Sequence, residues 1–445
     1  MQPTQRKTAL LIIFLTVFID LLGFGMVLPL LPIYGKQLAQ IDGYSPGQVG
    51  MIVGLLMSSF SAMQFLFLPI WGRLSDRIGR RPVILIGLAG STFFYAMFGV
   101  ATFYRSLTGL FITRIGAGIA GATISTAQAF IADTTAKQHR ARGMAMIGAA
   151  FALGFTLGPL LGVVSLFAGG EISMSPAPGF AAAALSGAAL LLAILRLPES
   201  LSRESESAAR KLFDRAALRA AISLPSIGLL LVASFVAVFS FANFESTLSL
   251  QITQIVGAKP GEITSAPLRA LMGWIAARHY DDPEDARLIV VFATFAYLGI
   301  ILTLAQGFLV RRLSGRMSEG SMATMGAITA IAGFMLLAVA ARREDFTLLL
   351  EAMALEVVGF AFVNPSLQSL ISRRSDPRLQ GSILGLGQSM SSLARILGPI
   401  CGIWLLEKSH EWPYWAAALC MALGLGMIVP AVRGGKDFAE RDQAA

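Results

Sequence analysis

Charged residues and cysteines are scarce in this chain. Of its 445 residues, only 14% are charged and 55% are hydrophobic, which gives a mean hydropathy of +0.69. Soluble domains usually carry about 25% charged residues, so the composition indicates an integral membrane protein rather than a soluble enzyme. The two cysteines, Cys401 and Cys420, both fall inside apolar runs, which argues against a structural disulfide framework.

Sequence motifs for metal, nucleotide and nucleic-acid chemistry are also missing. His139, His279 and His410 lie far apart, and no Cys/His group has metal-ligand spacing. There is no P-loop pattern and no Rossmann fingerprint, so we expect no cofactor, and a process driven by ATP has no support. The net charge is +9, but the basic residues are spread over alternate loops, so nucleic acid is not an expected partner.

Twelve long apolar runs alternate with polar segments. A membrane-spanning helix needs about 20 apolar residues. With both ends inside, the inner segments hold 24 Lys and Arg and the outer loops hold nine. This asymmetry predicts an all-α protein of the inner cell membrane with both termini in the cytoplasm. The expected spans are 9–34, 48–71, 83–104, 107–130, 143–168, 179–197, 225–255, 287–310, 320–341, 346–371, 382–406 and 412–432.

A polar and highly charged stretch, residues 198–224, lies between six spans on each side. We therefore expect two six-helix halves, residues 1–197 and 225–445, joined by a cytoplasmic linker. Residues 257–286 interrupt the second half as an outer insertion with apolar residues at helical spacing. This spacing predicts an amphipathic helix on the outer leaflet, and the alternative is a lid over an outer entrance.

The two halves share a Gly-Pro pattern. Gly158-Pro159 with Gly162 recurs 240 residues later as Gly398-Pro399 with Gly402. Internal repeats of this kind are typical of transporters, in which the substrate site lies between the halves near the midplane of the membrane.

The turn at residues 72–82 is short and strongly basic. It reads Gly-Arg-Leu-Ser-Asp-Arg-Ile-Gly-Arg-Arg-Pro, and its four arginines indicate the cytoplasmic face. This stretch resembles the loop between the second and third helices of the major facilitator superfamily, whose pattern is G-x-L-x-D-R-x-G-R-R. The resemblance implies a twelve-helix transporter in which the turn controls gating through Gly72, Asp76, Arg77, Gly79 and Arg80.

Asp76 is the only acid within this turn. We expect it to close the cytoplasmic side by meeting the start of the eleventh span near residues 381–383, because a carboxylate is stabilised at a helix N-terminus. The alternative is that Asp76 only neutralises local arginines and sets the turn.

Six ionisable residues lie inside the expected spans, and each costs roughly 3 kcal/mol at the bilayer centre. Four are acids and two are bases, so they cannot all pair, and at least one carboxyl must be protonated or face water in some state. Glu351 lies near the outer end and can reach water. The remaining five are the candidate proton-coupling residues, Asp20, Arg114, Glu245, Glu356 and Arg395. A static Glu356–Arg395 pair is the alternative for the last two.

Three segments of the first half resemble a narrower group, the twelve-spanning drug:proton antiporters that include the tetracycline efflux proteins. The fourth-span segment that begins Arg114-Ile-Gly-Ala-Gly resembles instead a motif of the whole superfamily, whose arginine is tied to proton coupling. The three are the run around Asp20, the run Ile131-Ala132-Asp133, and the fifth-span segment with Gly154, Gly158, Pro159 and Gly162. Val163 replaces the second glycine of the usual pair. The resemblance implies export of a small amphipathic compound in exchange for protons, by a monomer working through alternating access.

The substrate pocket is the part that the sequence defines least. An apolar cavity with a few polar groups suits an amphipathic solute. Two alternatives to an exporter remain. One is a uniporter or symporter of a metabolite on the same fold, and the other is a receptor or scaffold without transport activity. No group of residues in the sequence has a catalytic pattern, so we expect no enzyme. The candidate lining residues are Gln64, Gln128, Phe241, Asn243, Phe360, Asn364 and Gln388.

Overall fold

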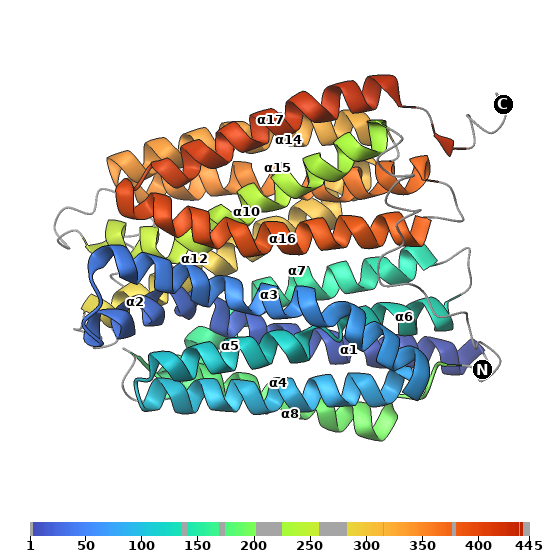
Figure 1. Cartoon of the computed structure of the whole chain (residues 1–445), viewed down its shortest axis with the longest axis horizontal. Coiled ribbons are helices and arrows are strands. Elements are labelled where there is room, and N and C mark those ends of the chain that lie inside the picture. The colour runs from blue at the N-terminus through green and yellow to red at the C-terminus, as the bar shows by residue number, and fades with distance from the viewer. Residues whose placement is uncertain are drawn as a thin grey trace. The chain divides into compact units, whose positions relative to one another are not determined.

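A computed structural model describes most of the chain, and every regular element in the described part is helical (Figure 1). Among the described residues, twelve helical stretches are long and apolar enough to cross a membrane, which confirms the predicted all-α, twelve-span fold. The outer insertion falls almost wholly outside the described residues, and so does most of the linker. The described residues are 3–135, 140–168, 174–201, 225–257, 283–314, 316–375, 380–435 and 437–438.

The first six spans are built from eight α-helices and one short 3₁₀ turn. The first span is interrupted by the 3₁₀ turn, which contains Pro29, and Pro32 lies in the first turn of the helix that follows; the fourth span is split into two helices. The elements are α1 (Pro3–Val27), η1 (Leu28–Leu30), α2 (Leu31–Ile41), α3 (Pro46–Ile78), α4 (Arg80–Phe103), α5 (Leu107–Gly121), α6 (Ile124–Thr134), α7 (Arg140–Ala168) and α8 (Ala177–Arg196).

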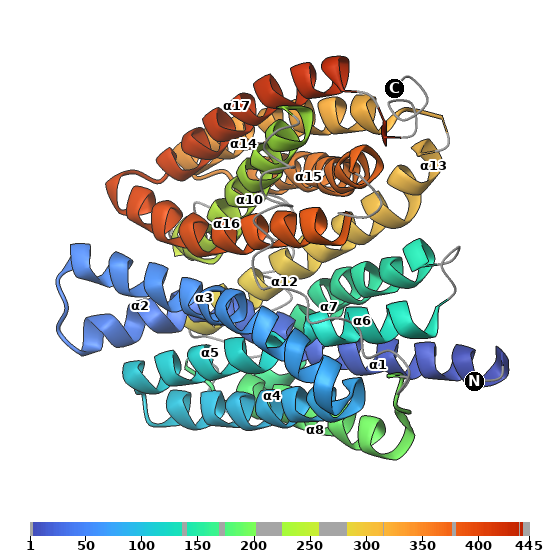
Figure 2. The ribbon, with the colours of Figure 1, turned by 45° about the vertical axis from the view of Figure 1, so that its right-hand side comes forward.

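The last six spans include one π-helical segment, η4, which continues α12. In Figures 1 and 2, α14 lies alongside both α15 and α17. The elements are α10 (Pro225–Gly257), α12 (Pro283–Leu304), η4 (Ala305–Val310), α13 (Arg311–Leu313), α14 (Glu319–Arg343), α15 (Phe346–Arg374), α16 (Gln380–Lys408) and α17 (Trp412–Gly434).

The chain divides into two compact units. The first unit comprises residues 1–210 and 278–300, and the second comprises residues 211–277 and 301–445. Most of α12 belongs to the first unit, and near its end it packs closely on α7: a Cβ atom on Gly299 would lie 2.5 Å from Thr156 Cα. The division into halves at the linker stays a prediction.

Glycines allow a close helix approach in the first unit, where α1 packs against α7. A Cβ atom on Gly25 would lie 2.6 Å from the carbonyl oxygen of Gly154, and one on Gly158 would lie 2.7 Å from Gly25 Cα. The sequence repeat has a counterpart in the second unit, where α10 packs against α16. There a Cβ on Gly402 would lie 2.7 Å from Asn243 Oδ1. The Gly-Pro segments therefore occupy corresponding helix crossings.

We predict that Gly158→Ala destabilises the protein, because the new methyl group has no space between α1 and α7. Inserting a carbon into a close-packed contact costs about 1–3 kcal/mol, so the apparent melting temperature in detergent should fall. Gly148→Ala is the matched control: it lies on the same helix, and a Cβ atom there meets nothing within 4 Å. Equal melting temperatures for the two variants would contradict this account of the crossing.

Candidate functional site

Asp20 on α1 is bonded to hydroxyl groups. Its Oδ1 atom accepts a hydrogen bond of 2.8 Å from Ser186 Oγ on α8, and the Ser91 side chain on α4 also hydrogen-bonds to it. Ser186 and Ser91 are buried, and no basic residue in the described ranges forms an ion pair with Asp20. The structure therefore holds this carboxyl between three helices without a cation.

Arg114 on α5 is held by aromatic rings rather than by an acid. Its guanidinium carbon lies 4.5 Å from the ring centroid of Phe60 and 5.8 Å from that of Phe24. The side chain is buried, and Nε has no hydrogen-bond partner within the described structure. Tyr95 on α4 interacts electrostatically with both Asp20 and Arg114. Cation–π contact stabilises a desolvated guanidinium by about 2 kcal/mol, so Arg114 keeps its place without forming a salt bridge.

Three of the predicted ionisable residues come together in the second unit, each from a different helix. Glu245 on α10 interacts electrostatically with Arg395 on α16 and with Glu356 on α15. Glu356 is fully buried, and neither of its carboxylate oxygens has a hydrogen-bond partner in the part of the chain described. The alternative of a static Glu356–Arg395 pair is therefore wrong: Arg395 interacts with Glu245 instead.

An aromatic pair lies next to these acids. The rings of Phe241 and Phe360 stack with their centroids 4.1 Å apart and their planes at 18°. Phe241 precedes Glu245 by four residues on α10, and Phe360 follows Glu356 by four residues on α15. Residues four apart lie on the same face of a helix. The two helices thus present an aromatic level and an acidic level one turn apart.

The remaining candidates for substrate contact are dispersed. Gln64 Nε2 donates to the carbonyl oxygen of Gly121 over 3.3 Å. Asn243 is fully buried at the α10–α16 crossing, and neither its amide nitrogen nor its oxygen has a described hydrogen-bond partner. Gln128 and Gln388 are exposed, and half-buried Asn364 accepts a long 3.5 Å bond from Gln368. A role for each in substrate binding stays a prediction.

The basic turn is organised around Arg80. Its guanidinium pairs with Asp76 at 2.5 Å and with Asp133 of α6 at 3.1 Å, and it donates to Ser75 Oγ over 2.6 Å. Asp76 therefore has a local partner within its own turn. The expected latch involves residues of the second unit, so it stays a prediction, as do the gating roles of the exposed Arg77 and of Gly72.

Glu199, a residue of the expected linker, binds the N-terminus of α4. Its carboxylate accepts hydrogen bonds from the backbone N–H groups of Arg80 (2.9 Å) and Arg81 (3.1 Å). Gly79 has φ +104° and ψ 159°, a conformation open essentially to glycine alone, and a Cβ atom there would overlap the Glu199 carboxylate. A carboxylate at a helix N-terminus is stabilising, so Glu199 ties the end of the sixth span to the basic turn.

The fold and its buried ionisable clusters define a polytopic membrane transporter, and comparison with known proteins gives the family. The family model described as "Major Facilitator Superfamily" matches residues 13–399 and 305–437. The class C tetracycline resistance protein of Escherichia coli is 32% identical over 437 residues, which cover 97% of this chain and 98% of that protein. The chain belongs to the major facilitator superfamily, and it is similar to tetracycline resistance proteins.

Two further comparisons agree. Major facilitator superfamily domain-containing protein 10 of Homo sapiens is 29% identical over 469 residues, covering 93% of this chain and 91% of that protein. The crystal structure of the human organic anion transporter MFSD10 (TETRAN) superposes with a TM-score of 0.66 at 24% identity, covering 96% of this chain and all of that one. The predicted family and fold are thereby confirmed.

We predict that the two glycines of the basic turn respond differently to alanine. Gly79→Ala should lower the apparent melting temperature, because it combines a backbone penalty of about 1–3 kcal/mol with a clash against Glu199. Gly72→Ala should leave stability unchanged, since a Cβ atom there meets nothing within 4 Å. Thermal unfolding of both variants in detergent measures this difference, and a Gly79→Ala protein as stable as the parent would refute it.

Proposed function

We propose that this protein exports a small amphipathic solute in exchange for protons, with its two halves alternating in access to either side of the membrane. The observation that carries the proposal is Asp20, a carboxyl within a membrane span that is bonded to serine hydroxyls rather than to a cation. Similarity to tetracycline resistance proteins over nearly the whole chain supports the same reading.

The hydroxyl partners suit a carboxyl that gains and loses a proton. A serine hydroxyl donates to a carboxylate and accepts from a carboxylic acid, because it carries one donor and two acceptor positions. Ser91 and Ser186 can therefore bond to either form of Asp20 by rotating their hydroxyl hydrogens. Arg114 supplies a positive charge on the neighbouring helix, linked to Asp20 through Tyr95. Release of the proton can thus occur without any rebuilding of the site.

The cluster in the second unit provides a further proton or cation site. Arg395 interacts with Glu245, and Glu356 has no basic partner of its own among the described residues, so one base stands against two carboxyl groups. An ionised carboxylate that is buried without a partner is strongly unfavourable. The second acid must therefore be protonated, or its negative charge must be balanced by a bound solute. Because the cluster has two acids and one base, we assign it a role in both proton coupling and substrate recognition.

The aromatic pair gives the solute its apolar contact. Stacked rings of Phe241 and Phe360 offer a flat apolar surface, and the ionisable groups of Glu245 and Arg395 belong to the same cluster. Pockets for small molecules combine such apolar walls with a few convergent polar groups. An amphipathic solute with a ring system and an ionisable substituent fits this combination.

The proposal includes the setting of the protein. Both termini lie in the cytoplasm, the membrane is the inner cell membrane, the partners are the bilayer, protons and one small molecule, and the protein works as a monomer. One proton that moves through 100 mV releases about 2.3 kcal/mol. This is enough for roughly fiftyfold accumulation of a solute on the other side.

We predict that Asp20→Asn abolishes proton-driven transport and leaves folding intact, because an amide keeps the hydrogen bonds to serine and cannot carry a proton. The assay uses inverted vesicles with an imposed proton gradient. The probes are chosen by thermal stabilisation of the purified protein, and tetracycline is the first of them. Addition of the probe should dissipate the gradient in vesicles with the parent protein only. The control is Glu351→Gln, which removes an exposed acid of a span and should behave like the parent. Solute-driven proton movement in Asp20→Asn would overturn the proposal, and solute uptake without proton movement in the parent would indicate a uniporter.

For the second cluster, we predict that Glu245→Gln and Glu356→Gln change the pH dependence of transport or the preference for solute charge. Each substitution removes one of the two acids of the cluster, so one acid and one base remain and their charges can balance without a proton. Transport of cationic, neutral and anionic probes across a range of pH measures the change. If both variants match the parent at every pH and for every probe, the acids of the second unit are structural.

A further inference from the structure

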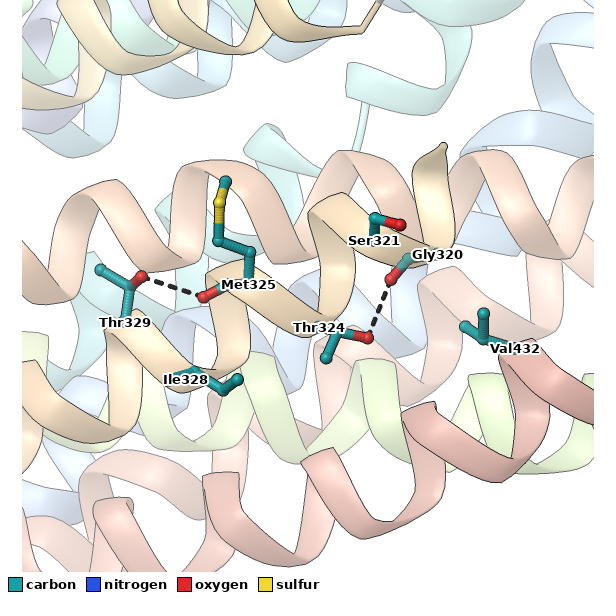
Figure 3. A pocket seen from close by; sticks show the side chains of 7 residues that line it. All are labelled: Gly320, Ser321, Thr324, Met325, Ile328, Thr329 and Val432. Atoms are coloured by element: carbon teal, nitrogen blue, oxygen red, sulfur yellow. Dashed lines mark hydrogen bonds between the residues drawn. The ribbon is translucent and has the colours of Figure 1, made fainter. Parts of the chain in front are cut away.

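A groove of about 410 Å³ lies on the second unit where α14 and α17 meet (Figure 3). Six of its lining residues belong to one side of α14, from Gly320 to Thr329, and Val432 of α17 completes it. Gly320 makes the junction possible, because a Cβ atom there would overlap the side chain of Val432. The groove belongs to neither ionisable cluster and has no part in the proposed transport chemistry.

The groove is chemically apolar although three of its residues carry hydroxyl groups. Figure 3 shows that Thr324 bonds back to its own helix at the Gly320 carbonyl oxygen, as Thr329 does at that of Met325, each over 2.9 Å. Ser321 shares a 2.9 Å bond with Ser318, the N-cap of the helix. With these hydroxyls already bonded, the surface offers mainly methyl and methylene groups. An apolar chain therefore fits it better than a polar solute.

The position of the groove suits a lipid. Gly320 is the second residue of α14, and Val432 lies two residues before the end of α17, so one end of the groove is at the polar boundary of the spans. From there it follows α14 for nine residues, which at 1.5 Å per residue is about 14 Å. Ile328, near its inner end, is 55% exposed. The groove thus runs from the expected cytoplasmic boundary into the hydrocarbon layer.

Positive charge is available at the polar end. Arg316 and Arg433 are exposed near the two helix ends, and neither forms an ion pair within the described ranges. Arg373, by contrast, is already paired with Glu319 at 2.8 Å and with Asp437 at 2.5 Å. Arginine side chains close to a membrane surface attract anionic headgroups and bind phosphate through paired N–H donors.

We propose that this groove binds one acyl chain of an anionic phospholipid, whose headgroup is held by Arg316 and Arg433. The lipid covers the junction between α14 and α17, where Gly320 leaves the groove open. The inference is independent of the proposed antiport, because it concerns the surface that faces lipid and not the buried acids.

Native mass spectrometry of the full-length protein with added phosphatidylglycerol or phosphatidylcholine tests the groove. The parent should retain phosphatidylglycerol in preference to phosphatidylcholine, and Ile328→Trp, which fills the groove, should lose most of the retained lipid. Met335→Trp is the matched control, because Met335 lies seven residues further along the same helix, is 45% exposed and does not line the groove. Retention in Ile328→Trp equal to that in Met335→Trp would overturn the proposal.

The arginines are tested separately, so that a folding defect in the tryptophan variant leaves the proposal testable. Arg316→Gln and Arg433→Gln should each lower the preference for phosphatidylglycerol over phosphatidylcholine about fivefold, which corresponds to ~1 kcal/mol per basic residue. Arg342→Gln, an exposed arginine at the opposite end of α14, should leave the preference unchanged. A parent that retains both lipids equally, or arginine variants with unaltered preference, would contradict the assignment.

Discussion

A charged group in the hydrocarbon layer of a membrane must be neutralised, paired or hydrogen-bonded, and this constraint shapes both units of the protein. Each buried ionisable group meets it differently. Asp20 is bonded to two serine hydroxyls, Arg114 lies against two phenylalanine rings, and Arg395 interacts with one of two acids. Only Arg395 interacts with a group of opposite charge, Glu245, and Glu356 is left without a hydrogen-bond partner among the described residues. A site that binds and releases protons needs ionisable groups whose charges are not fully balanced by fixed partners.

Close helix packing provides the second constraint, and here the two units differ at one informative position. In both units a Gly-Pro segment lies against the first helix of the unit. In the first unit Gly158 faces Gly25, whereas in the second unit the equivalent Gly398 faces Ala242 and the next glycine, Gly402, faces Asn243. Asparagine brings a polar amide into the crossing, and both of its polar atoms lack a described partner. An unsatisfied buried amide costs about 1–3 kcal/mol, so the crossing of the second unit is built less favourably than its counterpart.

Much of the architecture could be predicted from the sequence, but the side-chain contacts between its helices could not. Apolar runs of about 20 residues between basic loops define spans without reference to packing, and the pattern around Asp76 and Arg80 identifies the family. Ser186, the partner of Asp20, and Glu199, the partner of Arg80, could not be predicted. Each lies more than 100 residues from its partner, and no local sequence pattern indicates the contact. The pairing of Glu356 with Arg395 was wrong for a related reason: a helix that is apolar on all sides gives no indication of which face turns toward which neighbour.

The proposed antiport requires that Asp20 does not keep its proton while the solute is bound. Purified protein in weakly buffered detergent tests it directly, with a pH indicator that follows the addition of tetracycline or of the best-stabilising compound of the panel. The account predicts that protons are released in proportion to the bound compound by the parent, and that Asp20→Asn binds the compound with that release reduced or lost. Binding by the parent without any change in pH, verified by thermal stabilisation in the same sample, would contradict it.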